Sequence, residues 1–99
     1  EVRTDPSVLS YINNLVRATR SRRDIYLGAS PRGGIALLRT SRVMAVSEGR
    51  DFVIPDDVKA LALPALRHRI VLTPEAEVEG RSPDEVISEV IKSVEVPRS

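Results

Sequence analysis

Four stretches of this chain open with a proline and continue with apolar residues at helical spacing, and this pattern limits the fold more than any other feature. The openings are Asp5-Pro6, Ser30-Pro31, Ile54-Pro55 and Ser82-Pro83. Proline suits the first helical position because its fixed φ is already helical and its missing N–H would have no partner there. Aspartate and serine are in addition good helix caps. The chain is therefore predicted to form four amphipathic helices.

The lengths of the first two helices follow from where their apolar stripes end. The first helix is predicted to run from Pro6 to about Arg20, and the second from Pro31 to Glu48. Gly49 is the expected stop of the second helix, because glycine readily adopts the left-handed conformation that terminates helices. The last helix begins at Pro83 and has the clearest apolar stripe, made of Val86, Ile87, Val90, Ile91 and Val94.

The third helix, which begins at Pro55, contains a second proline at Pro64. A proline there removes the amide that would bond to Ala60 and crowds that carbonyl, so we expect a kink or a break into two short helices. Residues 25–27 could be extended or could form a loop. Residues 70–72 are predicted to form a brief extended segment, followed by an acidic, flexible stretch over 73–80.

The predicted fold is thus a single all-α domain over residues 1–99: a small bundle of four helices, or more if the third breaks, with at most short β segments. The chain has no cysteine and one histidine, His68, which argues against a metal site. No apolar run is long enough to span a membrane, and no signal-peptide pattern is present, so we expect a cytoplasmic location.

The net charge of +1 conceals an uneven distribution. Residues 1–50 carry nine basic and four acidic side chains, so the first half of the chain can face an anion. On a helical wheel of the second helix, Leu37 and Ser41 lie on one side and Arg32, Arg39 and Arg42 on the other. This helix is predicted to be buried along one face and basic on the opposite face.

The loop that leads into this helix, GASPRGG over residues 28–34, places Arg32 in the first helical turn. Helix N-termini favour anions, because free N–H groups and the helix dipole point toward them. An arginine is unfavourable there unless an anion compensates it. We therefore expect Arg32 to meet a phosphate, although a plain surface arginine is the alternative that the loop alone would allow.

Several separated segments resemble the C-terminal lid of the MoxR family of AAA+ ATPases. They are residues 16–20 (VRATR), the GASPRGG loop, residues 52–59 (FVIPDDVK) and residues 66–71 (LRHRIV), which occur in the order found in that family. In MoxR proteins an α/β nucleotide-binding domain precedes a small helical lid, and ATP lies between them. The resemblance covers roughly residues 5 to 80 and implies an AAA+ lid fold.

The resemblance also implies roles for individual residues. Arg32 would be the second sensor of nucleotide state and reach the γ-phosphate of ATP, with Ser30 and Pro31 setting its geometry. Gly28, Ala29 and Tyr11 are expected near the adenine or ribose. ATP and Mg²⁺ would be held mainly by an α/β domain outside this sequence.

The sequence lacks a phosphate-binding loop ending in lysine and serine or threonine, and no residue is placed to orient water. We expect no ATP hydrolysis by this chain alone and no catalytic residue in it. By resemblance, the full-length protein is an ATPase that matures or assembles an unidentified client, this chain being a domain excised from it. The lid's partners would be its own N-terminal ATPase domain and the neighbouring subunits of a hexameric ring, contacted through Arg39 and Arg42 unless these are simply solvated.

A different class of function stays open: an independent helical module that binds nucleic acid or an acidic protein surface through its arginines. The group Arg17, Arg20, Arg22 and Arg23 resembles a small nucleic-acid patch, but only Tyr26 is near enough to stack on a base, which favours a solvated helix end. His68 is expected to contact helix-terminal carbonyls. The acid pairs at residues 56–57 and 84–85 are expected to cap helices. A stand-alone enzyme has almost no support from the residues.

Overall fold

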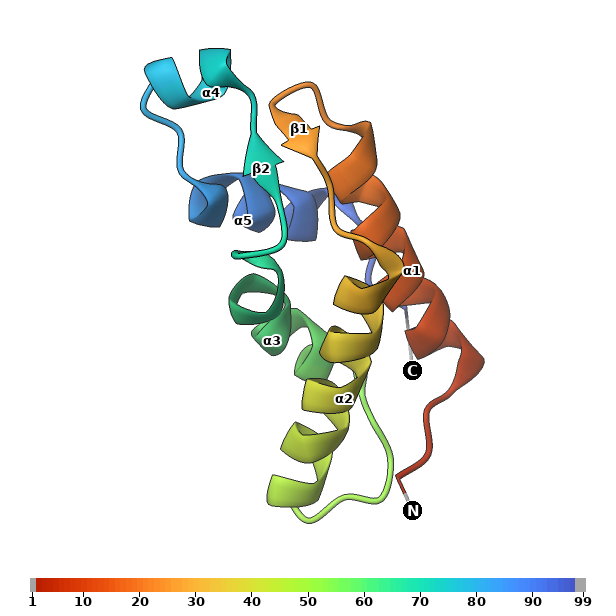
Figure 1. Cartoon of the computed structure of the whole chain (residues 1–99). Coiled ribbons are helices and arrows are strands. Elements are labelled where there is room, and N and C mark those ends of the chain that lie inside the picture. The colour runs from red at the N-terminus through yellow and green to blue at the C-terminus, as the bar shows by residue number, and fades with distance from the viewer. Residues whose placement is uncertain (1, 98–99) are drawn as a thin grey trace.

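The computed structural model describes residues 2–97, which form five helices and two short strands (Figure 1). In chain order they are α1 (Pro6–Ser21), β1 (Ile25–Leu27), α2 (Pro31–Ser47), α3 (Pro55–Leu66), β2 (Val71–Leu72), α4 (Pro74–Val78) and α5 (Pro83–Ser93). The predicted all-α class is confirmed, because the only sheet in the described residues is one pair of short strands.

The starts of the long helices agree with the proline pattern. The Asp5 carboxylate accepts a hydrogen bond of 2.8 Å from the Ser7 amide, so it caps α1. Ser82 and Glu85 form a reciprocal capping box at the start of α5. Helix α2 ends beside Gly49, whose φ of 75° is left-handed, as predicted.

Of the two outcomes predicted at Pro64, a kink or a break, the break into two short helices is wrong. Helix α3 runs without interruption from Pro55 to Leu66, and the Arg67 amide still bonds to the Leu63 carbonyl at 3.0 Å. Both Pro64 and Ala60 are exposed. The carbonyl that loses its amide partner therefore lies on the solvent side, where water can satisfy it, and the helix continues.

The stretch over residues 73–80, predicted to be flexible, instead contains helix α4. Thr73 caps it by accepting a 3.2 Å hydrogen bond from the Ala76 amide, and Ala76 is buried. Gly80 follows with a φ of 83°, which a residue with a side chain adopts only under strain. A local cap and one apolar anchor thus order this acidic segment.

The two short apolar segments at residues 25–27 and 70–72 contain β1 and β2, which pair as an antiparallel sheet. Ile25 pairs with Leu72 and Leu27 with Val71. The sheet joins the turn after α1 to the segment after α3, so it closes one end of the molecule next to α4 (Figure 1). The Thr73 amide extends this contact by bonding to the Asp24 carbonyl at 3.0 Å.

The core lies between α1, α2, α3 and α5. Its largest fully buried apolar side chains are Tyr11, Leu15, Leu37, Leu66, Ile87, Val58, Val86 and Val90. Helices α2 and α3 pack side by side, and α5 crosses against α1 and α3 (Figure 1). The resulting body is elongated, 44 × 21 × 20 Å, and leaves the start of α2 at the surface beside the loop that leads into it.

Candidate functional site

The loop over residues 28–30 is held against the last turn of α1 through the backbone of Ala29. The Ala29 amide donates a 2.9 Å hydrogen bond to the Thr19 hydroxyl oxygen, and the Ala29 carbonyl accepts a 2.9 Å bond from Nε of Arg20. Thr19 is fully buried, and its hydroxyl donates in turn to the Val16 carbonyl at 2.6 Å. The loop is therefore tied to the end of α1 through both backbone polar groups of one residue, Ala29.

Helix α2 begins directly after this attachment. Ser30 is the N-cap, but its side chain makes no capping hydrogen bond; its carbonyl accepts the Gly33 amide at 2.9 Å. Pro31 occupies the first helical position. Arg32 follows in the first turn, and its side chain is exposed.

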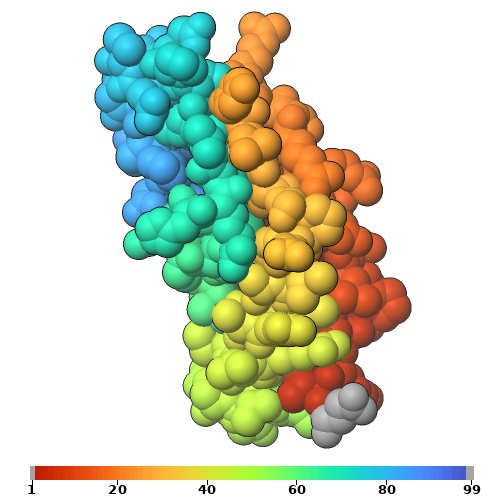
Figure 2. All heavy atoms as spheres, in the orientation of Figure 1, coloured from red at the N-terminus to blue at the C-terminus, as the bar shows by residue number. Residues whose placement is uncertain are grey.

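Arg32 lines an open hollow of about 360 Å³ together with Ile35, Ala36, Arg39 and Arg69. No acidic side chain lines the hollow, and none of its three arginines forms an ion pair within residues 2–97. Figure 2 shows the loop and the first turns of α2 in gold, next to the teal segment that follows α3. Three positive charges thus face solvent without an anion.

The sequence did not single out Arg69 as a partner of Arg32. Nε of Arg69 donates a 3.0 Å hydrogen bond to the Ala65 carbonyl, which holds the side chain along α3. A Cβ on Gly33 would lie 3.4 Å from Cδ of Arg69 and 3.2 Å from Cβ of Ala29. A glycine in the first turn of α2 therefore lets the Arg69 stem lie close against that turn; this glycine is the signal that could have indicated the contact.

An apolar groove of about 260 Å³ lies on the α1 side of the same helix start. Its lining residues are Leu9, Ile12, Asn13, Val16, Pro31, Gly34, Ile35 and Leu38. Gly34 keeps the groove open, because a Cβ there would meet Val16 at 3.4 Å and Ile12 at 3.7 Å. Ile35 borders both the groove and the arginine hollow. The first two turns of α2 are thus flanked by an apolar surface and by a cationic one.

Not all of the sequence-predicted site residues reach this surface. Tyr11, which is expected near the adenine or ribose, is 1% exposed and packs in the core. Burial raises the pKa of its phenol, and the charge of Asp56 adds to the shift. The Ala29 side chain is also buried, so this residue acts only through its backbone. Gly28 is half-buried beneath the end of α1.

Arg42 does not line the hollow with Arg32 and Arg39. Nε of Arg42 instead donates a 3.3 Å hydrogen bond to the Thr4 hydroxyl of the N-terminal segment. Ten residues separate Arg42 from Arg32, which turns it about 80° around a helix of 3.6 residues per turn. The three arginines of the basic face predicted for α2 therefore do not all line one hollow, since Arg42 is directed toward the N-terminal segment.

Half of the predicted basic patch around residues 17–23 has a structural role. Arg20 holds Ala29, and Arg22 forms ion pairs with Asp24 at 2.8 Å and Glu89 at 2.7 Å. Arg81 also binds Glu89, at 2.6 Å, so this network ties the turn after α1 to α5. The hydrogen bond from Arg22 lowers the pKa of Asp24 below its usual range, although partial burial opposes the shift. Arg17 and Arg23 are exposed.

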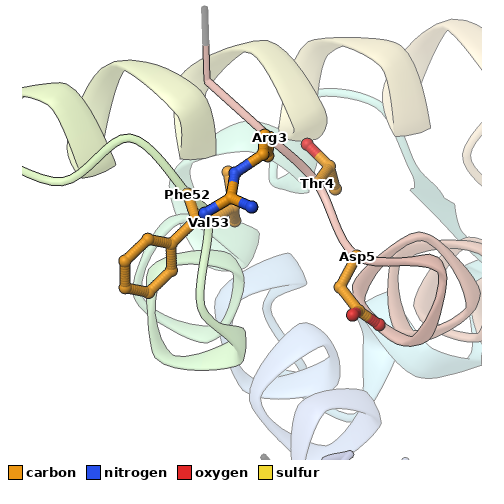
Figure 3. A pocket seen from close by; sticks show the side chains of 5 residues that line it. All are labelled: Arg3, Thr4, Asp5, Phe52 and Val53. Carbon is orange, nitrogen blue, oxygen red and sulfur yellow. The ribbon is translucent and has the colours of Figure 1, made fainter.

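A second hollow, of about 580 Å³, shares no lining residue with the arginine hollow or the apolar groove. It is lined by Arg3, Thr4, Asp5, Phe52 and Val53, and Figure 3 shows them along the N-terminal segment and the loop before α3. The acid is already used as the cap of α1, and Arg3 approaches the exposed Asp51 at 3.9 Å. None of the sequence-predicted site residues lines this hollow.

Other site types find little support in the part of the chain that the structure describes. His68 is exposed and makes no hydrogen bond to the helix-terminal carbonyls there, contrary to expectation. Over residues 2–97, no group of three or more His, Cys, Asp or Glu side chains is arranged so that it could hold a metal ion. No helix within the same range is both long and apolar enough to cross a membrane.

Comparison with known proteins shows the family of the chain. A family model described as "AAA lid domain" matches residues 17–90. YeaC of Bacillus subtilis, described as uncharacterized, is 43% identical over 96 residues, which are 97% of this chain and 30% of YeaC. The chaperone MoxR1 of Mycobacterium tuberculosis is 35% identical over 101 residues, covering 93% of this chain and 27% of MoxR1.

A solved structure agrees in fold as well as in sequence. The chain superposes on a protein from Cytophaga hutchinsonii, described as a candidate ATPase, with a TM-score of 0.91 and 36% identity, over 98% of this chain and 32% of that one. The chain thus spans about a third or less of the length of these relatives. The resemblance predicted from the sequence is confirmed: the chain belongs to the AAA lid domain family and is a lid of the type found in MoxR AAA+ ATPases.

Proposed function

We propose that this lid senses the state of the nucleotide bound by an α/β ATPase domain of the same protein, with Arg32 contacting the terminal phosphate of ATP. The observation that carries the proposal is the exposed, unpaired Arg32 at the start of α2, beside Arg39 and Arg69 in one hollow. A guanidinium makes charge-assisted hydrogen bonds to phosphate, and these bonds exist only while the phosphate is present. Their loss after hydrolysis would release the lid.

The two surfaces that flank α2 suit the two ends of a nucleotide. The apolar groove between α1 and α2 would receive the base or a surface of the ATPase domain, and the arginine hollow would face the phosphates. Gly28 and Ala29 would contribute through the loop that carries Ser30 and Pro31, not through contacts of their own side chains with the base. The Mg²⁺ ion and the groups that orient water would come from the α/β domain.

At the level of the whole protein, we propose that ATP binding and hydrolysis drive the maturation or assembly of a client protein. The name of the related chaperone MoxR1 supports this role. Assembly into a hexameric ring is expected from the resemblance, with Arg39 and Arg42 as contacts to a neighbouring subunit. Arg39 lines the arginine hollow, whereas Arg42 bonds to the Thr4 hydroxyl of the N-terminal segment, so Arg39 would be the freer of the two to reach a neighbour.

Substitution of Arg32 in the full-length protein tests the sensor role. Arg32→Ala is expected to lower the rate of ATP hydrolysis about tenfold or more, since hydrogen bonds to a charged group contribute about 1.5–3 kcal/mol. Steady-state kinetics would measure kcat and KM for ATP. Arg23→Ala is the matched control, because Arg23 is exposed and forms no ion pair within residues 2–97. Unchanged turnover and unchanged nucleotide affinity in Arg32→Ala would reject the sensor role.

The unpaired arginines also favour a second candidate, binding to nucleic acid. Titration of DNA binding with salt separates the two functions, because contacts with phosphates release counterions and weaken steeply as salt increases. Strong, salt-sensitive binding that is lost in Arg39→Ala and Arg42→Ala, with normal ATP hydrolysis in Arg32→Ala, would favour the nucleic-acid function over the sensor.

A further inference from the structure

Gly28 shows how closely the sensor loop lies against α1. A Cβ added at this position would be 2.8 Å from the Thr19 carbonyl oxygen and 2.9 Å from both Cα and Cγ of Arg20. Contacts with backbone atoms at such distances cannot be relieved by rotating a side chain. The glycine therefore permits a close approach between the loop and the last turn of the helix, and this approach brings Ala29 within reach of two side chains.

The side chains of Thr19 and Arg20 bind the two backbone polar groups of Ala29. The Thr19 hydroxyl accepts from the Ala29 amide and Arg20 donates to the Ala29 carbonyl, each at 2.9 Å. The Ala29 side chain is completely buried. The position and the orientation of this peptide segment are thereby determined by α1.

Arg32 follows Ala29 by three residues, and the N-cap of α2 contributes no side-chain bond of its own to holding the first turn. The N-cap Ser30 makes no side-chain capping bond, whereas Asp5, Thr73 and Ser82 do so at their own helices. Pro31 restricts the backbone between them. The attachment of Ala29 thus substitutes for the missing cap in setting the direction of the first turn.

We propose that Thr19 and Arg20 are positioning residues for Arg32, and that they make the end of α1 and the sensor loop one rigid body. This inference rests on the proposed sensor function of Arg32. When Arg32 binds or releases a phosphate, α1 is then displaced together with the loop, and the change of nucleotide state is passed directly to a helix that spans much of the domain.

A double-mutant cycle in the full-length protein tests the inference. Thr19→Val removes the hydroxyl but keeps the buried shape, and Arg20→Met keeps the aliphatic stem but removes Nε. Each is expected to reduce kcat of ATP hydrolysis about two- to tenfold, no more than Arg32→Ala does, because each removes one of the two bonds to Ala29 and leaves Arg32 itself in place. In an Arg32→Ala background the same changes are expected to have no further effect, because they act through Arg32.

Two further variants separate positioning from general damage to the fold. Thr19→Ser retains the hydroxyl and is expected to restore most of the activity lost in Thr19→Val. Arg23→Met matches Arg20→Met in chemistry, but it alters an exposed arginine outside the attachment and is expected to leave kcat unchanged. If Thr19→Val does not fold, the cycle of Arg20→Met with Arg32→Ala stands on its own.

The outcomes distinguish this inference from the sensor function itself. Two outcomes would overturn the positioning role alone. In the first, Thr19→Val or Arg20→Met lowers kcat equally with and without Arg32. In the second, neither variant lowers kcat, although Arg32→Ala does. An active Arg32→Ala would overturn both. The inference is supported if Thr19→Val and Arg20→Met lower kcat in the wild-type background but not in the Arg32→Ala background, and if Thr19→Ser restores kcat.

Discussion

At the scale of single residues, Asp57 is a buried acid that joins two elements through charge-assisted hydrogen bonds. Its carboxylate is 4% exposed and accepts two hydrogen bonds of 2.7 Å from the Arg50 guanidinium. It also accepts the Ile54 amide at 2.9 Å, which closes the start of α3. One side chain therefore joins the loop after α2 to the next helix.

Asp57→Asn is expected to lower the free energy of unfolding by about 2 kcal/mol at neutral pH, because charge-assisted hydrogen bonds in a buried site are lost. Urea denaturation would measure the change. Asp56→Asn is the matched control: it alters the neighbouring acid in the same helical turn, which is exposed and forms no ion pair within residues 2–97. Equal effects of the two substitutions would contradict a special role of Asp57.

The stabilisation by Asp57 depends on pH in a defined direction. The hydrogen bonds from Arg50, supported by the Ile54 amide, lower the pKa of Asp57 below its usual value of 3.8, although burial opposes the shift. A carboxyl with a lowered folded-state pKa stabilises the fold above its unfolded pKa and loses this effect as pH falls through the folded value. The stability difference between wild type and Asp57→Asn should thus be constant above about pH 5 and shrink below pH 4.

At the scale of elements, helix α3 tolerates a proline that ordinarily breaks helices. Pro64→Ala should raise the free energy of unfolding by about 1 kcal/mol, because alanine restores the amide for the Ala60 carbonyl and has a higher helix propensity, partly offset by a more flexible unfolded chain. Thermal or urea denaturation would measure the gain. Pro74→Ala at the first position of α4 is the control and should give no gain, since proline suits that position. A destabilised Pro64→Ala would show that the proline packs favourably.

At the scale of the whole molecule, the proposed nucleotide site is only one wall of a cleft. The arginine hollow is open, and the apolar groove lies beside it without enclosing it. A few charge-assisted contacts offset only part of the entropy lost on association. The isolated chain should therefore bind ATP with a Kd of about 1 mM or weaker, measured by titration calorimetry. Submicromolar binding would show that the chain itself contains a complete site.

The start of each long helix followed from the sequence because it depends on neighbouring residues. A proline, a capping residue and apolar side chains at helical spacing act within a few positions of one another, and they predicted α1, α2 and α5 closely. The same local reasoning placed Arg32 in a first turn at the surface. It also found the segments whose order resembles the MoxR lid, although that step used the resemblance to the family.

The missed helix α4 has a local start at Thr73 and Pro74, but most differences arose where the outcome depends on residues far apart in the chain. Only the tertiary structure decided that Tyr11 lies in the core, that the carbonyl left free by Pro64 faces solvent, and that Arg69 lines the hollow of Arg32. The pairing of β1 with β2 and the attachment of Ala29 to α1 are of the same kind. By itself the sequence determined where the four long helices begin, since propensity and capping are local, although it missed the short helix α4. The packing of the helices decided which side chains face a common site, since burial and contact are properties of the assembled fold.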